Sequence, residues 1–592
     1  MGNDKDKNKM LTDLFFRLLP VQVLIVAMGA VNSIVDGTIA GRFIDAGAVG
    51  VVGLYFSLVR VMDAFGGVML GGTSVICGRL MGTGDINKTK SIFSLNLSVT
   101  FMFSVLLTAI SFAAPGSVAA VLGANDDLKP FLVSYILGYA VGIVPQMLAQ
   151  QIASFLQMER QSRLGYAGIA GMMASNIILD IVFVAVLGWG PMGLALATAV
   201  SNWVYFLILV PYYFTKKAQL RYRWASINWP DILPLFKIGF PGALLVMCIA
   251  VRSVVINRIL IYWVGEDALS AQSAYSMISG LFIAFALGVG ATVRMLCSVS
   301  IGEEDRRSLH TLMKISFSKA LPMSVVVTLI VMSVSAPVTS LFFPDTMSEV
   351  YRLTRQLFLI FSCCIPLIVL CQICTNYLQA AGHHLFVDIL SVFDGFFSMV
   401  IPSVILAPIL GALGVWLANP IGIVMTLLLN LGYVLFINRH FPKSVDEWLL
   451  LREDFGVPES DCLYLGISDM EGVSRTAEAV HSFCDGHDID KKRSYYSALC
   501  LEEMAGNIVR HGFYKDRKKH VIEAKVIYKN GEIILRIKDD CIPFNPKERA
   551  ELLDGEDITK NIGLRMVSTI ADQMEYQNLM GLNVLTIKME AA

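Results

Sequence analysis

Four oxygen-bearing side chains lie inside apolar stretches of the chain, where polar and ionisable groups are costly and therefore point to function. They are Asp36 in a first stretch, Asn176 and Asp180 in a fifth, and Thr198 in a sixth. Because Asn176 precedes Asp180 by four residues, the two share one face of a helix. Two carboxylates, an amide and a hydroxyl can together hold Na⁺ or share a proton. Helix capping or structural pairing of the two acids is the alternative.

A second set of chemically capable residues lies in the polar C-terminal part. Glu503, Asn507 and His511 recur every four residues, along one face of an expected helix. An amide oxygen can ligate Mg²⁺ and a carboxylate can activate a hydroxyl, so this face suits a Mg²⁺–phosphate site. A merely solvated helix face is the alternative. Downstream, Asp539 ends an expected strand, and Gly563 opens an expected helix whose backbone N–H groups can meet phosphate.

Composition divides these two sets between unlike parts of the chain. The 592 residues are 55% hydrophobic and 16% charged. The charged share is about 11% in residues 1–441 and about 31% in residues 442–592. The first composition is typical of a membrane protein and the second of a soluble domain. The net charge is −1 and no strongly basic domain is present, which argues against nucleic acid as a partner.

The apolar part predicts a membrane protein of twelve helices, since a span needs about 20 mostly apolar residues. The predicted spans are residues 12–35, 48–78, 91–115, 129–154, 163–186, 190–214, 235–263, 270–298, 313–341, 353–380, 384–408 and 412–438. Lys and Arg gather in alternate connections, for example at Lys5 to Lys9 and at Lys216 to Arg223. This asymmetry predicts that both termini are cytoplasmic in a multi-pass protein of the cell membrane.

A weak internal repeat, in which Gly72 and Gly84 align with Gly290 and Gly302, predicts two pseudo-symmetric lobes of six helices. We place these lobes at residues 1–225 and 226–441, followed by a linker at 442–458. Residues 459–592 then form an α+β domain, an α/β sandwich. Its expected strands are 461–467, 519–528, 531–538, 574–579 and 582–589, and its expected helices are 471–485, 491–510, 546–553 and 562–573.

Roughly residues 10–440 resemble the multidrug and toxic compound extrusion (MATE) transporters. The resemblance rests on three motifs, which run from Asn32 to Arg42, from Leu80 to Asp85, and from Asn176 through Asp180 and Gly190 to Thr198. It implies alternating-access export of small organic, mainly cationic compounds, driven by Na⁺ or H⁺. It also implies that Asp36, Asn176, Asp180 and Thr198 form the cation site of the N-terminal lobe.

Roughly residues 460–592 resemble the ATP-binding domain of histidine kinases, and most closely the anti-sigma-factor serine kinases. The motifs are Leu501 to Gly512, Ile537 to Pro546 and Lys560 to Arg565. The resemblance implies an ATP and Mg²⁺ site in which Glu503 is the catalytic base, Asn507 binds Mg²⁺ and Asp539 recognises adenine. His511 and Gly563 would complete the nucleotide site. Two expected glycines are replaced by Cys541 and Asn561.

Two roles therefore remain open for the C-terminal domain. It is either a serine/threonine kinase with a soluble regulatory protein as its partner, or a nucleotide sensor that controls transport. For the membrane part, a flippase for lipid-linked saccharides and a transporter-like receptor that signals through the kinase domain are alternatives. The sequence contains no GxxxxGK[ST] loop, which argues against an ATP-driven pump of the P-loop type.

Overall fold

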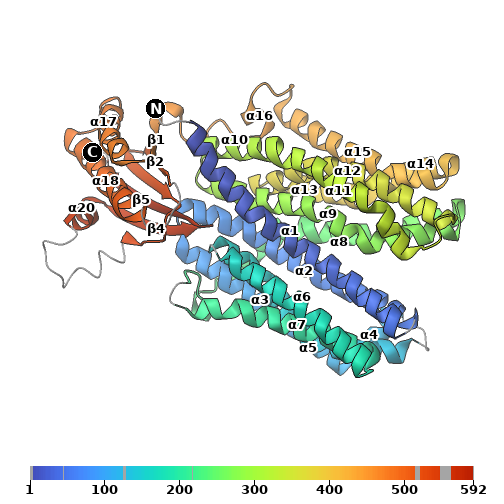
Figure 1. The fold of residues 1–592 in the computed structure, drawn as a ribbon. Helices are drawn as coiled ribbons and strands as arrows, with labels where there is room; N and C mark the ends of the chain where they lie inside the picture. Colours follow the sequence, from blue (N-terminus) through green and yellow to red (C-terminus); the bar gives the residue numbers. More distant parts are fainter. Residues whose placement is uncertain are drawn as a thin grey trace.

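The computed structural model describes residues 4–44, 46–123, 128–159, 161–215, 218–513, 520–546 and 562–590. Among these residues, twelve helical segments are long and apolar enough to cross a membrane, as the sequence predicts. They form an elongated bundle, and the C-terminal domain sits at one end of it (Figure 1). We call this end of the bundle the domain side.

We call the first six spans the first lobe, and the first two of them also pack extensively against later spans. They are α1 (Asp4–Phe43), α2 (Ala46–Thr83), α3 (Ile86–Ala113), α5 (Lys129–Met158), α6 (Ser162–Asp180) with a π-helical turn (Ile181–Val186), and α7 (Gly190–Leu209) with a 3₁₀ turn (Val210–Phe214). A short helix, α4 (Pro115–Val121), joins α3 to α5. The first lobe therefore contains all four polar residues of the predicted cation site.

The last six spans form the second lobe. They are α8 (Ile232–Trp263), α9 (Glu266–Gly302), α10 with α11 (Arg306–Ile315, Leu321–Phe342), α12 (Glu349–Ala381), α13 with α14 (His384–Val392, Ser398–Leu410), and α15 (Ala412–Asn438). The predicted ninth span began at residue 313, whereas its helix begins at Arg306. The difference arises because the first turns of α10 are amphipathic and too polar to stand out by apolar length.

The described residues of the C-terminal domain form a five-stranded antiparallel sheet in the order β1-β2-β3-β5-β4, with helices on one face. Its strands are β1 (Cys462–Ile467), β2 (Ile522–Lys529), β3 (Glu532–Asp539), β4 (Gln573–Leu579) and β5 (Leu582–Glu590). Its helices are α17 (Met470–Asp485), α18 (Lys491–Asn507) with a π-helical turn (Ile508–Gly512), and α20 (Ile562–Ile570). The helix expected at 546–553 lies almost wholly outside the described residues.

The β2–β3 connection is a tight hairpin, as its sequence predicts. Asn530 and Gly531 have φ values of 54° and 79°. Positive φ at both central residues belongs to the turn whose twist matches the two strands, and asparagine followed by glycine tolerates it best. The hairpin thereby sets the register in which Glu523 lies opposite Lys538.

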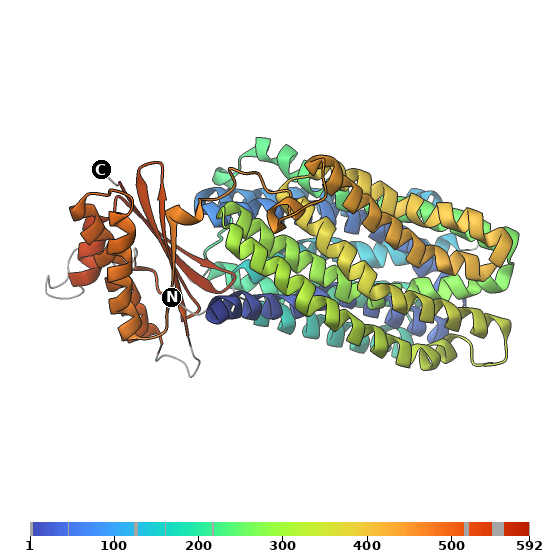
Figure 2. The same ribbon diagram turned by 90° about the horizontal axis from the view of Figure 1, so that it is seen from above.

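The sheet has two different faces because side chains alternate along each strand. On β3, Ile533, Leu535 and Ile537 pack into the hydrophobic core beneath the helices. The next residue, Lys538, points the other way and pairs with Glu303 at the end of α9. Accordingly, the sheet stands between its own helices and the bundle (Figure 2).

Lysines on this second face contact the acidic connection between α9 and α10. The Lys538 ammonium lies 2.6 Å from a Glu303 carboxylate oxygen, and the two side chains are only 12% and 3% exposed. Lys525 pairs with Asp305 at 3.3 Å, again with both side chains buried. Tyr464 on β1 hydrogen-bonds Asp305 at 3.4 Å. The half of the sheet formed by β1, β2 and β3 is therefore attached to the second lobe.

The turn between β4 and β5 contacts the first lobe. The Met580 carbonyl accepts a hydrogen bond from the Arg17 guanidinium on α1, at 2.7 Å. The Met580 N–H donates to the Met158 carbonyl at the end of α5, at 2.8 Å. Met580, Leu582 and Val584 are buried in the same hydrophobic cluster as side chains of α1, α2 and α9. The domain consequently touches both lobes.

Residues 442–458, the predicted linker, lie against the second lobe. Leu449 is buried, and its carbonyl accepts a 2.7 Å hydrogen bond from the Tyr377 hydroxyl on α12. Asp446 in α16 (Val445–Trp448) receives His310 at 2.6 Å and Arg306 at 3.4 Å. The connection to the domain is thus a docked segment of chain.

We expect acid to weaken the attachment through Asp305. Burial raises the pKa of Asp305, but Lys525, Lys538 and two hydrogen bonds from Ser308 outweigh burial and lower this pKa to about 2. A carboxylate whose pKa is lower in the folded protein than its usual 3.8 contributes stability above pH ~4, and this is lost as the pH falls toward ~2. The difference corresponds to about 2 kcal/mol.

Heat unfolding of the full chain, measured against pH for the wild type and Asp305→Asn, checks this expectation. The variant should unfold at a lower temperature than the wild type at neutral pH, and the gap should close as the pH approaches ~2. A gap that stays constant with pH would show that Asp305 ionisation does not contribute.

Candidate functional site

Side chains from three helices of the first lobe meet at the predicted cation site. The Thr198 hydroxyl on α7 donates to a carboxylate oxygen of Asp36 on α1, at 3.4 Å. The Asn176 amide on α6 donates to the Thr198 hydroxyl, also at 3.4 Å. Asp180 lies one turn after Asn176, at the last residue of α6 before the π-helical turn. The structure thus joins three of the four residues directly and places the fourth beside them.

This group is buried, and much of its oxygen is unsatisfied. Asp36, Asn176, Asp180 and Thr198 are 7%, 1%, 0% and 5% exposed. Among the described residues, one carboxylate oxygen of Asp36, the amide oxygen of Asn176 and both carboxylate oxygens of Asp180 have no hydrogen-bond partner. Buried oxygens without donors are unfavourable unless a cation or a proton satisfies them. The donor set therefore fits Na⁺ or H⁺.

The eleventh span, in the second lobe, contains a different acidic group. Asp394, in the π-helical turn Phe393–Phe397, accepts a 3.0 Å hydrogen bond from the Thr426 hydroxyl on α15. The Arg252 guanidinium on α8 donates to the Asp394 carbonyl at 3.2 Å. A fixed guanidinium therefore lies beside the backbone of this acidic residue.

Asp539, the residue matched to adenine recognition, lies at the end of β3 on the helix-covered side of the sheet. Its carboxylate accepts from the Cys541 N–H at 2.9 Å and from the Asn583 amide at 2.7 Å. Burial raises the pKa of Asp539, and these hydrogen bonds oppose the rise. The carboxylate is therefore held in a fixed orientation by β5 and by its own turn.

Glu503 and Asn507 lie one turn apart at the end of α18, half-buried, and His511 is exposed in the following π-helical turn. The Glu503 carboxylate packs against Gly563 so closely that a β-carbon there would lie 2.0 Å from its oxygen. Gly563 is in the first turn of α20, where the helix dipole favours an anion. Glu503 itself occupies that position, so a phosphate group there would have to displace it.

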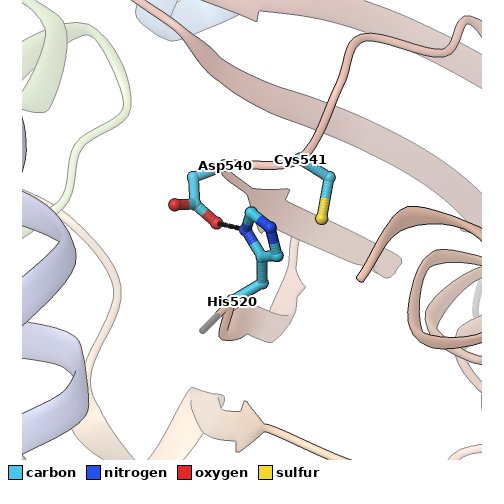
Figure 3. A group of neighbouring side chains, drawn as sticks. All are labelled: His520, Asp540 and Cys541. Atoms are coloured by element: carbon cyan, nitrogen blue, oxygen red, sulfur yellow. Dashed lines mark hydrogen bonds and ion pairs between the residues drawn. The ribbon is translucent and has the colours of Figure 1, made fainter. Parts of the chain in front are cut away.

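A further group lies where β3 ends. His520, Asp540 and Cys541 bring a nitrogen, an oxygen and a sulfur within 4.8 Å of one another (Figure 3). The His520 ring is bonded to the Asp540 carboxylate at 2.6 Å, and this bond accounts for their arrangement without an ion. Cys541 lies against Gly512, whose β-carbon would be 3.1 Å from the sulfur. The thiol thus fills space that the expected glycine would leave open.

The membrane bundle and the C-terminal domain match two different protein families. Residues 23–182 and 241–405 match the MatE family, and together these ranges cover more than half of the chain. The chain belongs to the MatE family. Residues 468–589 of this MatE protein match the histidine kinase-like ATPase domain. The docked linker at residues 442–458 lies in neither matched range.

Relatives of this MatE protein are named for multidrug resistance or multidrug export. It is 22% identical over 446 residues to a probable multidrug resistance protein, YoeA, of Bacillus subtilis, covering 73% of this chain and 95% of the relative. It is 27% identical over 246 residues to the multidrug export protein MepA of Staphylococcus saprophyticus, covering 39% of this chain and 53% of that protein.

Solved structures share the fold of the bundle. An outward-facing MATE family transporter of the MOP superfamily aligns with a TM-score of 0.66 at 19% identity, over 72% of this chain and 95% of that one. The Vibrio cholerae MATE transporter VcmN in its bent form aligns with a TM-score of 0.65 at 16% identity, over 74% and 99%. Both alignments extend over nearly the whole of those transporters, and neither covers this protein's full length.

Two polar residues of this MatE protein were not singled out from its sequence. Asn583 lies opposite Asp539 in the pairing of β3 with β5 and bonds its carboxylate. Arg294 on α9 donates to Ser74 on α2 at 3.2 Å and to Asn376 on α12 at 3.0 Å, which ties the two lobes together. A charged residue inside an apolar span was the available signal for Arg294.

Proposed function

We propose that this MatE protein exports small organic, mainly cationic compounds by alternating access, coupled to inward flow of Na⁺ or H⁺. The unsatisfied buried oxygens of Asp36, Asn176 and Asp180 are the observation that carries the proposal. The multidrug names of its relatives support the substrate class. The basic connections lie on the domain side, which supports cytoplasmic termini and a cytoplasmic domain.

The proposed coupling follows from the burial of these acids. A cation or proton at Asp36 and Asp180 neutralises charge that is otherwise costly in the membrane interior. Binding therefore favours the arrangement of helices that brings the two acids together, and release favours the other arrangement. The lobes of residues 1–225 and 226–441 would then alternate in exposing a central cleft to either side.

Transport by purified protein in liposomes tests this proposal. An imposed inward Na⁺ or H⁺ gradient should drive a fluorescent organic cation out of the compartment that the domain faces. ATP without an ion gradient should drive none. Movement that depends on ATP and ignores both gradients would contradict the proposal.

We further propose that the C-terminal domain binds ATP and Mg²⁺ and thereby regulates the transporter. In this proposal the Asp539 carboxylate accepts a hydrogen bond from the adenine amino group, Asn507 ligates Mg²⁺, and the start of α20 near Gly563 receives phosphate. Glu503 activates a hydroxyl once its carboxylate leaves Gly563. Bound Mg²⁺-ATP would supply a transferable phosphoryl group, and a soluble regulatory protein is the proposed acceptor if transfer takes place.

Glu503→Gln separates a kinase from a sensor. The substitution keeps the shape and removes the base, so we expect ATP binding to change by less than about threefold, while any phosphate transfer falls by at least about a hundredfold. Radiolabelled phosphate transfer and nucleotide binding should be measured on the same full-length preparation. If Glu503→Gln transfers phosphate as fast as the wild type, Glu503 is not the catalytic base. If the wild type binds ATP but transfers no phosphate, the domain is a nucleotide sensor and not a kinase.

A further inference from the structure

The face of the sheet that turns away from the nucleotide site bridges both lobes of the transporter. Along β3, Lys538 pairs with Glu303 of the second lobe, whereas the next residue, Asp539, faces the helices of the domain. Along β5, Leu582 and Val584 pack against the bundle, whereas Asn583 between them bonds Asp539. Docking residues and nucleotide-site residues therefore alternate on the same two strands.

The two attachments differ in kind. The contact with the second lobe is ionic, through Lys538, Lys525 and, at its rim, Lys529 with Glu304 at 2.5 Å. The contact with the first lobe is made by the β4–β5 turn. The backbone of Met580 hydrogen-bonds the Arg17 guanidinium and the Met158 carbonyl, and apolar side chains pack around it. One rigid sheet thus holds helix ends that belong to different lobes.

The lobes are themselves closed together beside these attachments. A β-carbon at Gly302 would lie 2.1 Å from the Arg79 carbonyl oxygen, so the ends of α9 and α2 touch backbone to backbone. The Arg79 guanidinium also donates to the Ala380 carbonyl on α12, across the lobes, at 2.5 Å. The docked position of the domain therefore coincides with a closed domain side of the transporter.

We propose that the C-terminal domain is a brace that holds the two lobes together on the domain side, so that this side opens only when the sheet releases one lobe. The consequence for transport rests on the alternating access proposed above. The brace itself concerns only the distance between the two lobes, which can be measured without substrate or an ion gradient. A failure of export would therefore leave it standing, and a failure of the brace would leave export standing.

The ion pair of Lys538 with Glu303 is the point at which to test the brace. Removing one partner of a buried pair leaves an uncompensated charge, which is far more costly than replacing both partners by neutral groups. Lys538→Met leaves the Glu303 carboxylate buried without its cation. Adding Glu303→Gln to the same protein removes that charge as well. In the single variant the sheet should separate from the second lobe, and in the double variant the sheet should bind the second lobe again.

Lobe separation can be measured on the full chain in lipid nanodiscs. A fluorophore pair would be introduced with unnatural amino acids at Asn87, at the start of α3, and at His440, just after α15. Both residues are exposed and on the domain side. We expect Lys538→Met to raise the fraction of molecules with separated lobes about tenfold, and the double variant to return it to within about threefold of the wild type. Lys491→Met, on the exposed start of α18, is the matched control and should leave the fraction unchanged.

A distance distribution in Lys538→Met identical to that of the wild type would overturn the brace. So would a double variant as separated as the single one, since that would indicate damage to the domain instead of a lost pair. Heat unfolding of each variant shows whether the domain is folded. If Lys538→Met alone does not fold, the comparison of the folded double variant with Glu303→Lys, which places two cations together, decides the question in the same way.

Discussion

Asp36→Asn should abolish ion-driven efflux while leaving the protein folded in the membrane. The asparagine keeps the size of the side chain and its hydrogen bond from Thr198, but it removes the negative charge that the buried oxygens present to a cation. Removing one carboxylate partner of a buried cation costs about 3 kcal/mol of binding free energy, which is about a hundredfold in ion affinity. Gradient-driven efflux in liposomes and ion binding by calorimetry should fall together.

Asp388→Asn is the matched control for this substitution. Asp388 lies in α13 of the second lobe, so the same chemical change is made in a membrane span outside the proposed site. Its efflux should stay within about twofold of the wild type. If Asp36→Asn transports as well as Asp388→Asn under the same gradient, the first-lobe oxygens are not the coupling site.

Asp539→Asn should remove most of the affinity for ATP. A hydrogen bond to a charged group contributes about 2 kcal/mol, and in this variant the new amide also faces the amide of Asn583 instead of accepting from it. We therefore expect ATP binding by the full-length protein to weaken about thirtyfold, with the secondary structure of the domain unchanged. Titration calorimetry in detergent measures the affinity directly.

Asp485→Asn serves as the control for the nucleotide site. Asp485 is exposed at the end of α17, outside the proposed pocket, so its removal changes the domain's charge equally and should leave ATP affinity alone. If Asp539→Asn and Asp485→Asn both bind ATP as tightly as the wild type, Asp539 does not contact the nucleotide. If both variants bind ATP equally weakly, the loss is a general effect of charge.

Features with a local physical cause could be predicted from the sequence. The twelve spans follow from apolar length, and β2 and β3 follow from alternation together with the turn at Asn530 and Gly531. The contact between Asp36 and Thr198 depends on how three helices pack, so only the MATE resemblance predicts it. No property of either residue alone specifies it.

Features that depend on contacts between distant segments were beyond the sequence pattern. Lys538 and Glu303 are separated by 235 residues, and on its strand Lys538 has the alternation of an ordinary solvated lysine. Asn583 meets Asp539 only because β3 pairs with β5, its non-consecutive neighbour in the sheet. The docked sheet and the hydrogen bond from Asn583 to Asp539 could therefore be recognised only in three dimensions.

Simultaneous measurement of ion and substrate movement is the most direct test of ion-coupled export by this protein. Liposomes containing the purified protein would be loaded with a fluorescent organic cation, and inward Na⁺ or H⁺ flux would be followed as the cation leaves. We expect ion inflow to accompany substrate exit in the wild type and Asp36→Asn to lose both. Substrate exit without ion inflow, or unchanged inflow in Asp36→Asn, would contradict it.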